Sequence, residues 1–282
     1  MTSTVHQHRW PAAAGVTPQG RGIYLIHGIG EHAGRYQRLA QQLSELGYEV
    51  GAHDHPGHGK SAGKRGVLNS EYHLEETARE QLIAFSQETD ATPILFGHSL
   101  GGLVAASMVL NLDVQVAGLI LSAPAFAPFI SPYNKLKLRV LNFVAPKFTQ
   151  QLPYKAHFLT HDEEEQQRGR ADPLNHRFKS ASIVTWLVSV GKRTLNKAPQ
   201  LSVPTLVLIA GEDVVVNPET MKTFVERAPK QLITERTYPD FRHEILNETA
   251  DRREQVHSDI KSWLASCGLD SNALEGQVIP HE

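Results

Sequence analysis

The chain has 282 residues, of which 40% are hydrophobic and 21% are charged, and its formal net charge is −2. This composition is typical of a soluble globular protein, and a charge so close to neutral gives no electrostatic reason to expect nucleic acid as a partner, because phosphate binding needs a clustered basic face. The single cysteine, Cys267, excludes an internal disulfide and a thiolate zinc cluster.

The beginning of the chain carries no recognisable targeting signal. Residues 1–15 lack the charged and then apolar pattern of a secretory signal, and no apolar run approaches the ~18 residues that a membrane span needs. We therefore expect a cytoplasmic protein, and we leave open whether it contacts a membrane peripherally.

Short apolar runs bounded by glycine or proline predict the strands of a central sheet. Most runs are too uniformly apolar for a sheet with one wet face, and amphipathic helical stretches separate them. This alternation predicts an α/β fold with a mostly parallel sheet flanked by helices. The predicted strands are residues 22–27, 48–52, 93–96, 116–122, 204–210 and 232–237, and the predicted helices are residues 36–46, 74–88, 100–110 and 252–266.

A histidine-rich run, "AHDHPGHG" at residues 52–59, follows the second predicted strand. The spacing of His53, His55 and His58 is close to that of zinc ligands in metallo-β-lactamase-like hydrolases, but a zinc site of that kind needs an aspartate where Gly57 stands. We favour a tight loop in which glycine permits positive φ and polar side chains bind the local backbone. This interpretation leaves His53 and His55 unexplained, and a zinc-dependent hydrolase remains a minor alternative.

The strongest chemical signal is Gly97-His98-Ser99-Leu100-Gly101-Gly102, which lies between a predicted strand and a predicted helix. That context is what a Gly-x-Ser-x-Gly nucleophile elbow requires, because the turn is strained and the helix N-terminus faces the serine. Ser99 is therefore the predicted nucleophile.

A long interval then interrupts the alternation of strands and helices. Roughly eighty residues, 124–203, contain no clear sheet strand, whereas connections in α/β units have about 2–6 residues. We expect a cap or lid. Its two apolar stripes could pack on the main domain, which we favour, or line an acyl-binding pocket or contact lipid. The first stripe contains Leu136, Leu138, Val140, Leu141, Phe143 and Val144, and the second contains Ile183, Trp186, Leu187 and Val190.

A serine nucleophile needs a base and a carboxylate that holds the base. Asp213 follows the strand predicted at 204–210, and His243 follows the strand predicted at 232–237, so both suit a site at the carboxyl ends of a parallel sheet. Backbone N–H groups must also meet the oxyanion, and we expect them from Ile29, in a glycine-flanked turn, and from Leu100.

Several motifs together resemble the monoacylglycerol lipase and lysophospholipase group of α/β-hydrolases. They are His27-Gly28-Ile29-Gly30-Glu31-His32 with Arg35-Tyr36, Asp54-x-x-Gly57-His58-Gly59-x-Ser61-x-Gly63, the elbow, Asp172-Pro173-Leu174, Val203-Pro204-Thr205 and His243-Glu244. The resemblance runs from about residue 22 to residue 264.

The resemblance implies an α/β-hydrolase fold in which a helical cap is inserted between the sixth and seventh core strands. It implies the triad Ser99, Asp213 and His243 and an oxyanion hole formed by Ile29 and Leu100. The Gly211-Glu212-Asp213 segment is one residue shorter than the usual Gly-x-x-Asp pattern, so Glu212 remains a rival for the acid.

We therefore predict a serine hydrolase that cleaves carboxylic esters of single-chain lipids, such as monoacylglycerols or lysophospholipids, through an acyl-enzyme. A general carboxylesterase, a thioesterase or an acyltransferase is the alternative on the same triad, and a non-catalytic binding protein is an alternative of another class. We expect a lipid ester as the partner, possible contact with a membrane through the cap, no cofactor and no metal. The predicted units are a core of residues 1–123 and 204–268, a cap of residues 124–203 and a polar tail of residues 269–282.

Overall fold

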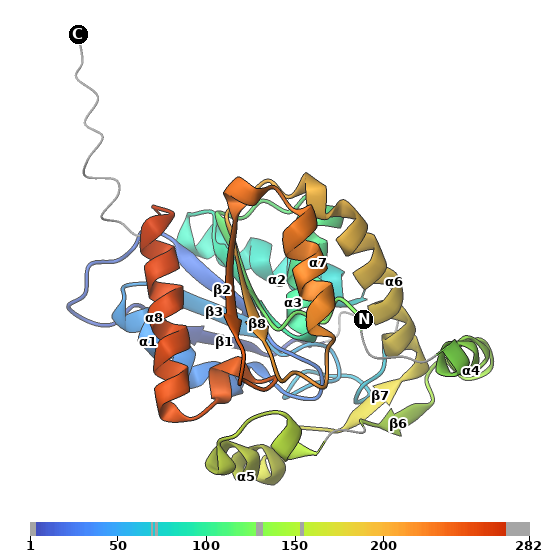
Figure 1. The fold of residues 1–282 in the computed structure, drawn as a ribbon. Coiled ribbons are helices and arrows are strands. Elements are labelled where there is room, and N and C mark those ends of the chain that lie inside the picture. The colour runs from blue at the N-terminus through green and yellow to red at the C-terminus, as the bar shows by residue number, and fades with distance from the viewer. Residues whose placement is uncertain (1–3, 69, 71–72, 128–131, 153–154, 269–282) are drawn as a thin grey trace.

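A computed structural model describes residues 4–68, 70, 73–127, 132–152 and 155–268 of the chain. The predicted polar tail at 269–282 lies outside the described residues. A central sheet lies between two layers of helices, and a smaller segment lies at one end of the sheet (Figure 1).

Seven strands form the central sheet of the described part, in the order β1-β3-β2-β4-β5-β8-β9. Neighbouring strands pair in parallel, except that β1 runs antiparallel to β3 at the edge. The predicted mostly parallel sheet is thus confirmed. The strands are β1 (Gln7–Trp10), β2 (Gly22–Ile26), β3 (Glu49–His53), β4 (Ile94–His98), β5 (Gly118–Ser122), β8 (Thr205–Ala210) and β9 (Ile233–Tyr238).

Strand β1 was not expected from the sequence. Its residues, "QHRW", form no apolar run, because the strand is at the edge of the sheet and is largely half-buried or exposed. The pairing of His8 with Ala52 and of Trp10 with Val50 attaches it to β3.

Helices cover both faces of the sheet. Helices α1 and α8 lie on one side in Figure 1, and α2, α3, α6 and α7 lie on the other. The bounds of these helices are α1 (Gln37–Glu45), α2 (His73–Thr89), α3 (Leu100–Asn111), α6 (Ala181–Lys197), α7 (Pro218–Arg227) and α8 (Ala250–Ser266).

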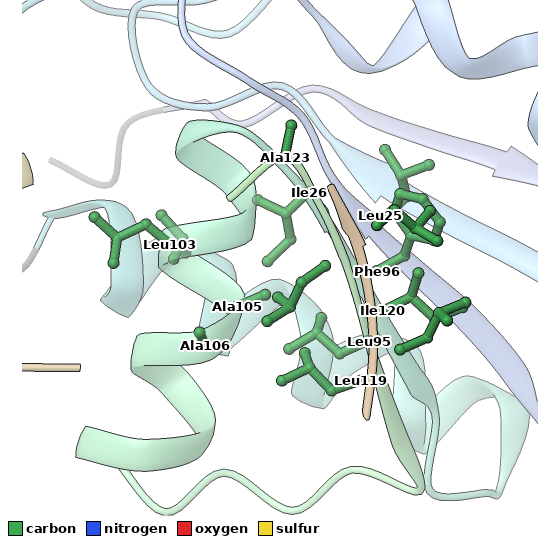
Figure 2. Close-up of a cluster of buried hydrophobic side chains, with 14 of the residues drawn as sticks. Leu25, Ile26, Leu95, Phe96, Leu103, Ala105, Ala106, Leu119, Ile120 and Ala123 are labelled. Atoms are coloured by element: carbon green, nitrogen blue, oxygen red, sulfur yellow. The ribbon is translucent and has the colours of Figure 1, made fainter. Parts of the chain in front are cut away.

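Helix α3 is the centre of the core. Its residues from Leu100 to Leu110 are all buried, because the sheet lies on one side of the helix and α6 packs on it from another. Figure 2 shows Ala105 of this helix facing side chains of the central strands, whereas Leu103 points away from the sheet. Fully burying a leucine side chain stabilises a fold by roughly 1.5–3 kcal/mol, so the helix that follows the elbow is firmly held.

The insertion follows the fifth core strand in chain order, β5, and precedes the sixth, β8. The described sheet has four strands before β5 and only β9 after β8, so these are its fifth and sixth strands, whereas the predicted sixth and seventh follow the strand numbering that the resemblance implied. The predicted helical cap also contains a two-stranded antiparallel ribbon. The elements before α6 are α4 (Pro132–Val144), β6 (Thr149–Gln151), α5 (Glu163–Ala171) and β7 (Phe178–Ser180).

The two apolar stripes of the insertion differ in burial. In α6, Ile183, Trp186 and Val190 are buried in the main core cluster, and the Trp186 Nε1–H donates to Glu75 Oε2 at 2.9 Å. In α4, by contrast, Phe143 is 89% exposed and Val144 is 67% exposed. The favoured packing on the main domain is therefore confirmed for α6, and the apolar side chains at the end of α4 face solvent.

Candidate active site

The turn around Ser99 has the geometry of a nucleophile elbow. Ser99 has φ 52° and ψ −117°, a left-handed backbone that is rare for a residue other than glycine. A Cβ atom at Gly97 would lie 2.4 Å from the Gly101 carbonyl oxygen, and one at Gly101 would lie 2.1 Å from that of Ile26. Only glycine fits these two positions, and the turn therefore holds Ser99 between β4 and α3.

Ser99, His243 and Asp213 form one hydrogen-bonded line. His243 Nε2 lies 2.8 Å from Ser99 Oγ, and His243 Nδ1 lies 2.7 Å from Asp213 Oδ2. All three residues are buried. The structure thus brings together the three side chains that the sequence placed after three different strands.

Backbone contacts hold Asp213 in this position. The loops after β8 and β9 are joined by hydrogen bonds from Gly211 N to Tyr238 O at 2.8 Å and from Glu212 N to Phe241 O at 2.9 Å. Asp213 Oδ1 accepts from the N–H groups of Val215 and Val216, at 2.8 and 2.9 Å. The Asp213 carboxylate is therefore fixed from both sides.

The rival acid, Glu212, points elsewhere. Its side chain is 52% exposed, and Oε2 lies 3.6 Å from Nε2 of His161, a residue of the insertion. Asp213, rather than Glu212, is the carboxylate in contact with His243.

The electrostatics of the pair suit proton transfer. Burial alone would raise the pKa of Asp213, but the charge and hydrogen bond of His243 outweigh it, so this pKa is lowered. Burial alone would lower the pKa of His243, but Asp213 outweighs it, so this pKa is raised above 6.5. The imidazole thus gains affinity for a proton from the carboxylate behind it.

The loop that carries Ile29 lies against the nucleophile. A Cβ atom at Gly28 would lie 3.3 Å from Ser99 Cβ, and Ile29, Ser99 and His243 line the same cavity. Leu100 is the first residue of α3, directly after Ser99. The two predicted oxyanion donors therefore belong to segments that flank Ser99.

A buried ion network ties the Ile29 loop to His243. Glu31 Oε1 accepts from Gly28 N and from the Tyr36 hydroxyl, each at 2.6 Å. Arg35 donates to Glu31 Oε2 at 2.9 Å and to both carboxylate oxygens of Glu244 at 3.0 and 2.6 Å. Because Glu244 directly follows His243, Arg35 connects the oxyanion loop with the base.

Glu31, Arg35 and Glu244 belong to motifs in the sequence, but the sequence alone assigned them no role. Charged side chains that directly adjoin a predicted oxyanion loop and a predicted base are expected to be buried and to need partners. That expectation is the signal that could have identified the network.

The histidine-rich loop is part of the scaffold. Among the described residues, the ligand atoms of His53, His55 and His58 form no group close enough to hold a metal ion. His53 Nδ1 lies 3.0 Å from the Tyr24 hydroxyl, and His55 Nε2 lies 3.1 Å from the His27 carbonyl oxygen. Burial lowers the pKa of His53 to about 3, so its ring stays neutral. These partners are those of a scaffold loop, which is the interpretation that the sequence favoured.

One group of possible metal ligands does occur in the described part, and it consists of His6, His8 and Asp54. Asp54 already accepts from the N–H groups of Ala33 and Lys60, at 2.9 and 2.8 Å, and from His8 Nε2 at 3.0 Å. Its carboxylate thus holds the loop after β3 against the edge strand.

A cavity of about 700 Å³ opens above Ser99. Core loops supply one side, with Ile29, Ser99 and His243, and the insertion supplies the other. Apolar side chains from both sides give it a partly hydrophobic lining, and these are Ile29, Leu152, Leu159, Phe178 and Val215.

The insertion is attached to the core around this cavity. His176 N donates to Gly30 O at 2.8 Å, and Glu244 N donates to Leu159 O at 2.7 Å. His32 Nε2 lies 2.8 Å from Asp172 Oδ2, which belongs to the "DPL" motif.

No described helix is long and apolar enough to cross a membrane.

Comparisons with known proteins point to one family. A family model described as "Serine aminopeptidase, S33" matches residues 18–250. The chain is similar to the monoacylglycerol lipase of Mycolicibacterium smegmatis, at 30% identity over 94% of this chain and 99% of that protein. It is also similar to the crystal structure of Paleococcus ferrophilus monoacylglycerol lipase, with a TM-score of 0.83 and 28% identity over 94% of this chain and 99% of that one. An abhydrolase domain-containing protein of Dictyostelium discoideum is 31% identical over 86% of this chain, which spans only 26% of that relative.

Proposed function

The chain belongs to the serine aminopeptidase S33 family of α/β-hydrolases, and from that premise we propose that it hydrolyses carboxylic esters of single-chain lipids through an acyl-enzyme on Ser99. The observation that carries the proposal is the line from Ser99 Oγ to His243 Nε2 and from His243 Nδ1 to Asp213 Oδ2, at 2.8 and 2.7 Å. This line adjoins a partly apolar cavity that has room for an acyl chain.

The first half of the reaction forms the acyl-enzyme. Ser99 Oγ attacks the ester carbonyl carbon as its proton passes to His243 Nε2, and Asp213 stabilises the imidazolium that results. The carbonyl oxygen becomes an oxyanion, which the N–H groups of Ile29 and Leu100 stabilise. The intermediate collapses as His243 returns the proton to the alcohol oxygen, and the alcohol leaves.

The second half releases the acid. A water molecule gives a proton to His243 Nε2 and attacks the acyl carbon, which forms a second tetrahedral intermediate. This intermediate breaks its bond to Ser99 Oγ, and His243 returns the proton to that oxygen. The products are a free carboxylic acid and the original enzyme.

Two observations support a single-chain lipid as the substrate. The relatives from Mycolicibacterium smegmatis and Paleococcus ferrophilus are named monoacylglycerol lipases. In addition, residues 124–180 supply apolar side chains such as Leu152, Leu159 and Phe178 to the cavity, as a cap over an acyl site would. We retain the cytoplasm as the location, and the exposed Phe143 and Val144 support peripheral contact of this cap with a membrane.

The test is a hydrolysis panel run with the wild-type chain and with Ser99→Ala. The panel contains monoacylglycerols, lysophospholipids, p-nitrophenyl esters of increasing chain length, a thioester and an aminoacyl amide. We expect the long-chain monoesters to be preferred and Ser99→Ala to lose about 10⁴-fold or more in kcat.

Several outcomes would contradict the proposal. Ester hydrolysis by Ser99→Ala within a few-fold of the wild-type rate would exclude the mechanism. A preference for acetyl esters, the thioester or the amide would instead exclude the lipid substrate, and the amide matters because the family description names an aminopeptidase. Transfer of the acyl group to an added alcohol in place of water would indicate an acyltransferase.

A further inference from the structure

We propose that the cavity selects esters that carry an anionic group, a phosphate or a carboxylate, over neutral esters of the same chain length. The inference rests on the proposed function, because it specifies the substrate class of the same site. It follows from the way charges are paired around the cavity.

The acidic side chains that line the cavity all have basic partners. Glu31 and Glu244 share the guanidinium of Arg35. Asp172 pairs with His32 at 2.8 Å, and Glu165 pairs with Arg38 and Arg168 at 3.0 and 2.9 Å. Each of these carboxylates thus has a basic partner, although Glu31 and Glu244 together keep one negative charge because Arg35 supplies only one positive charge.

Two basic side chains that line the cavity are not matched in the same way. Lys155 and Arg170 are exposed, and neither has a carboxylate within ion-pair distance among the residues described. Their charges are therefore available to an anionic substrate. The side of the wall that the insertion supplies thus offers two positive charges that no described carboxylate pairs with.

These two cations belong to the insertion, whereas Ser99 and His243 belong to the core loops on the other side of the cavity. Lys155 precedes a short 3₁₀ helix, and Arg170 lies in the last turn of α5. An ester bound at Ser99 would place its remaining parts toward this wall.

The guanidinium of Arg170 suits phosphate and carboxylate, because its planar N–H donors match two oxygens at once, and the Lys155 ammonium adds a second positive charge. A neutral glycerol head group would form only uncharged hydrogen bonds with the same side chains. Since Lys155 and Arg170 are exposed, each should change binding only about 2–5-fold, and salt should weaken the effect. Acting together, they should favour an anionic ester by about tenfold.

The experiment compares two matched pairs of substrates. The first pair is 1-lauroylglycerol and 1-lauroylglycerol 3-phosphate, which differ only by the phosphate, both used as monomers below their micelle concentrations. The second pair is p-nitrophenyl butyrate and p-nitrophenyl hemisuccinate, in which the anion lies on the acyl half. We expect kcat/KM of the anionic member to be higher by about tenfold in at least one pair, and the ratio to fall as salt is added.

Two variants test which side chains cause the preference. The double variant Lys155→Gln/Arg170→Gln should lower the anionic-to-neutral ratio by about tenfold, mainly through KM of the anionic ester. Arg170→Glu should lower the ratio further than Arg170→Gln does. The control is Arg139→Gln, which, like Arg170→Gln, removes one positive charge from an exposed position. Arg139 is on α4, outside the cavity lining, so this variant should leave the ratio unchanged.

The two pairs also separate the sources of the anion. A preference confined to the phosphate supports an anionic alcohol half, and one confined to the hemisuccinate supports an anionic acyl half. Equal or faster turnover of both neutral esters would overturn the inference, as would a ratio unaffected by the double variant. Neither result would affect the proposed function, which the Ser99→Ala variant and the hydrolysis panel test separately.

Discussion

The loops around Ser99 and the insertion that faces them differ in how completely their groups are paired. Around Ser99, the side chains of Asp213, His243 and Arg35 all have hydrogen-bond partners, and backbone N–H groups fix the Asp213 carboxylate. In the insertion, Phe143 is 89% exposed and Arg170 has no ion-pair partner among the described residues.

This difference indicates that the core loops and the insertion have different roles. Catalysis needs reacting atoms held in one geometry, and the core loops supply it through buried, mutually paired groups. Changes in the exposed part of the insertion affect few contacts, so substrate selection can vary there with little effect on stability. Substitutions in the two regions should therefore differ widely in their effect on catalysis.

Asp213→Asn should be the most damaging change in the core loops after loss of Ser99 itself. An asparagine retains the shape but cannot stabilise the imidazolium or hold His243 in the required tautomer, so we expect kcat to fall by about 10⁴-fold. Glu212→Gln is the matched control, since Glu212 neighbours Asp213 in sequence but is half-exposed, and it should change kcat less than a few-fold. Steady-state kinetics on one long-chain ester measures both. The reverse pattern would identify Glu212 as the acid.

Arg35→Met should impair catalysis by a smaller factor. The variant leaves Glu31 and Glu244 buried without their common cation, so the loop that carries Ile29 loses its support. Since losing an oxyanion donor costs about 10²–10³-fold in rate, we expect kcat to fall by roughly 10²-fold and KM to change less. Arg35→Lys should recover only part of the loss, because an ammonium cannot bridge both carboxylates as a guanidinium does.

Arg236→Met serves as the control for that experiment. Arg236 is an exposed arginine that pairs with Asp259 at 3.2 Å, away from the cavity. Its replacement should leave kcat unchanged. An equal loss of kcat in Arg35→Met and Arg236→Met would show that the network does not position the site.

Trp186→Ala and Phe143→Ala compare the two stripes of the insertion. Trp186 is 3% exposed and donates to Glu75, so its truncation should lower the free energy of unfolding by about 3–5 kcal/mol. Phe143 is 89% exposed, and its truncation should change stability by no more than about 0.5 kcal/mol. Chemical denaturation measures both values.

The same Phe143→Ala variant tests membrane contact. If the end of α4 docks on lipid, Phe143→Ala should reduce co-sedimentation with phosphatidylglycerol vesicles while leaving the unfolding curve in place. Undiminished vesicle binding would remove the argument for contact through this helix.

The sequence predicted the core and the turn around Ser99 well, because their signals are local. The uniformly apolar strands, the glycines around Ser99 and the buried helix after it each act over a few residues, and the structure has them where they were expected. Strand β1 was not predicted, because an edge strand needs no apolar run. The β6–β7 ribbon was not predicted either, because each of its strands has only three residues.

The remaining features depend on contacts between distant segments. Glu212 and Asp213 are adjacent, and only the course of the loop after β8 decides which carboxylate meets His243. The network of Glu31, Arg35 and Glu244 joins residues more than 200 positions apart, as the Arg35–Glu244 separation of 209 shows. Which cations of the cavity wall lack a carboxylate partner likewise depends on contacts between distant segments, and residue spacing does not determine that.

The pH dependence of catalysis should report on the core loops alone. His243 must be neutral to accept the proton of Ser99, so kcat/KM should fall as the pH decreases through the pKa of His243. Because Asp213 raises that pKa, this decrease, the acidic limb of the pH profile, should be centred above pH 6.5, the ordinary pKa of histidine. The neighbouring His98, whose ring centroid lies 5.1 Å from that of His243, should not add a second ionisation, since burial lowers its pKa to about 4. We therefore expect a single acidic limb with unit slope for the neutral ester. Asp213→Asn should move this limb to lower pH, because burial then acts on His243 without the opposing carboxylate. Single-turnover measurements on the variant test this shift. A limb that kept its position in Asp213→Asn would mean that the pairing of Asp213 with His243 does not set the proton affinity of the base.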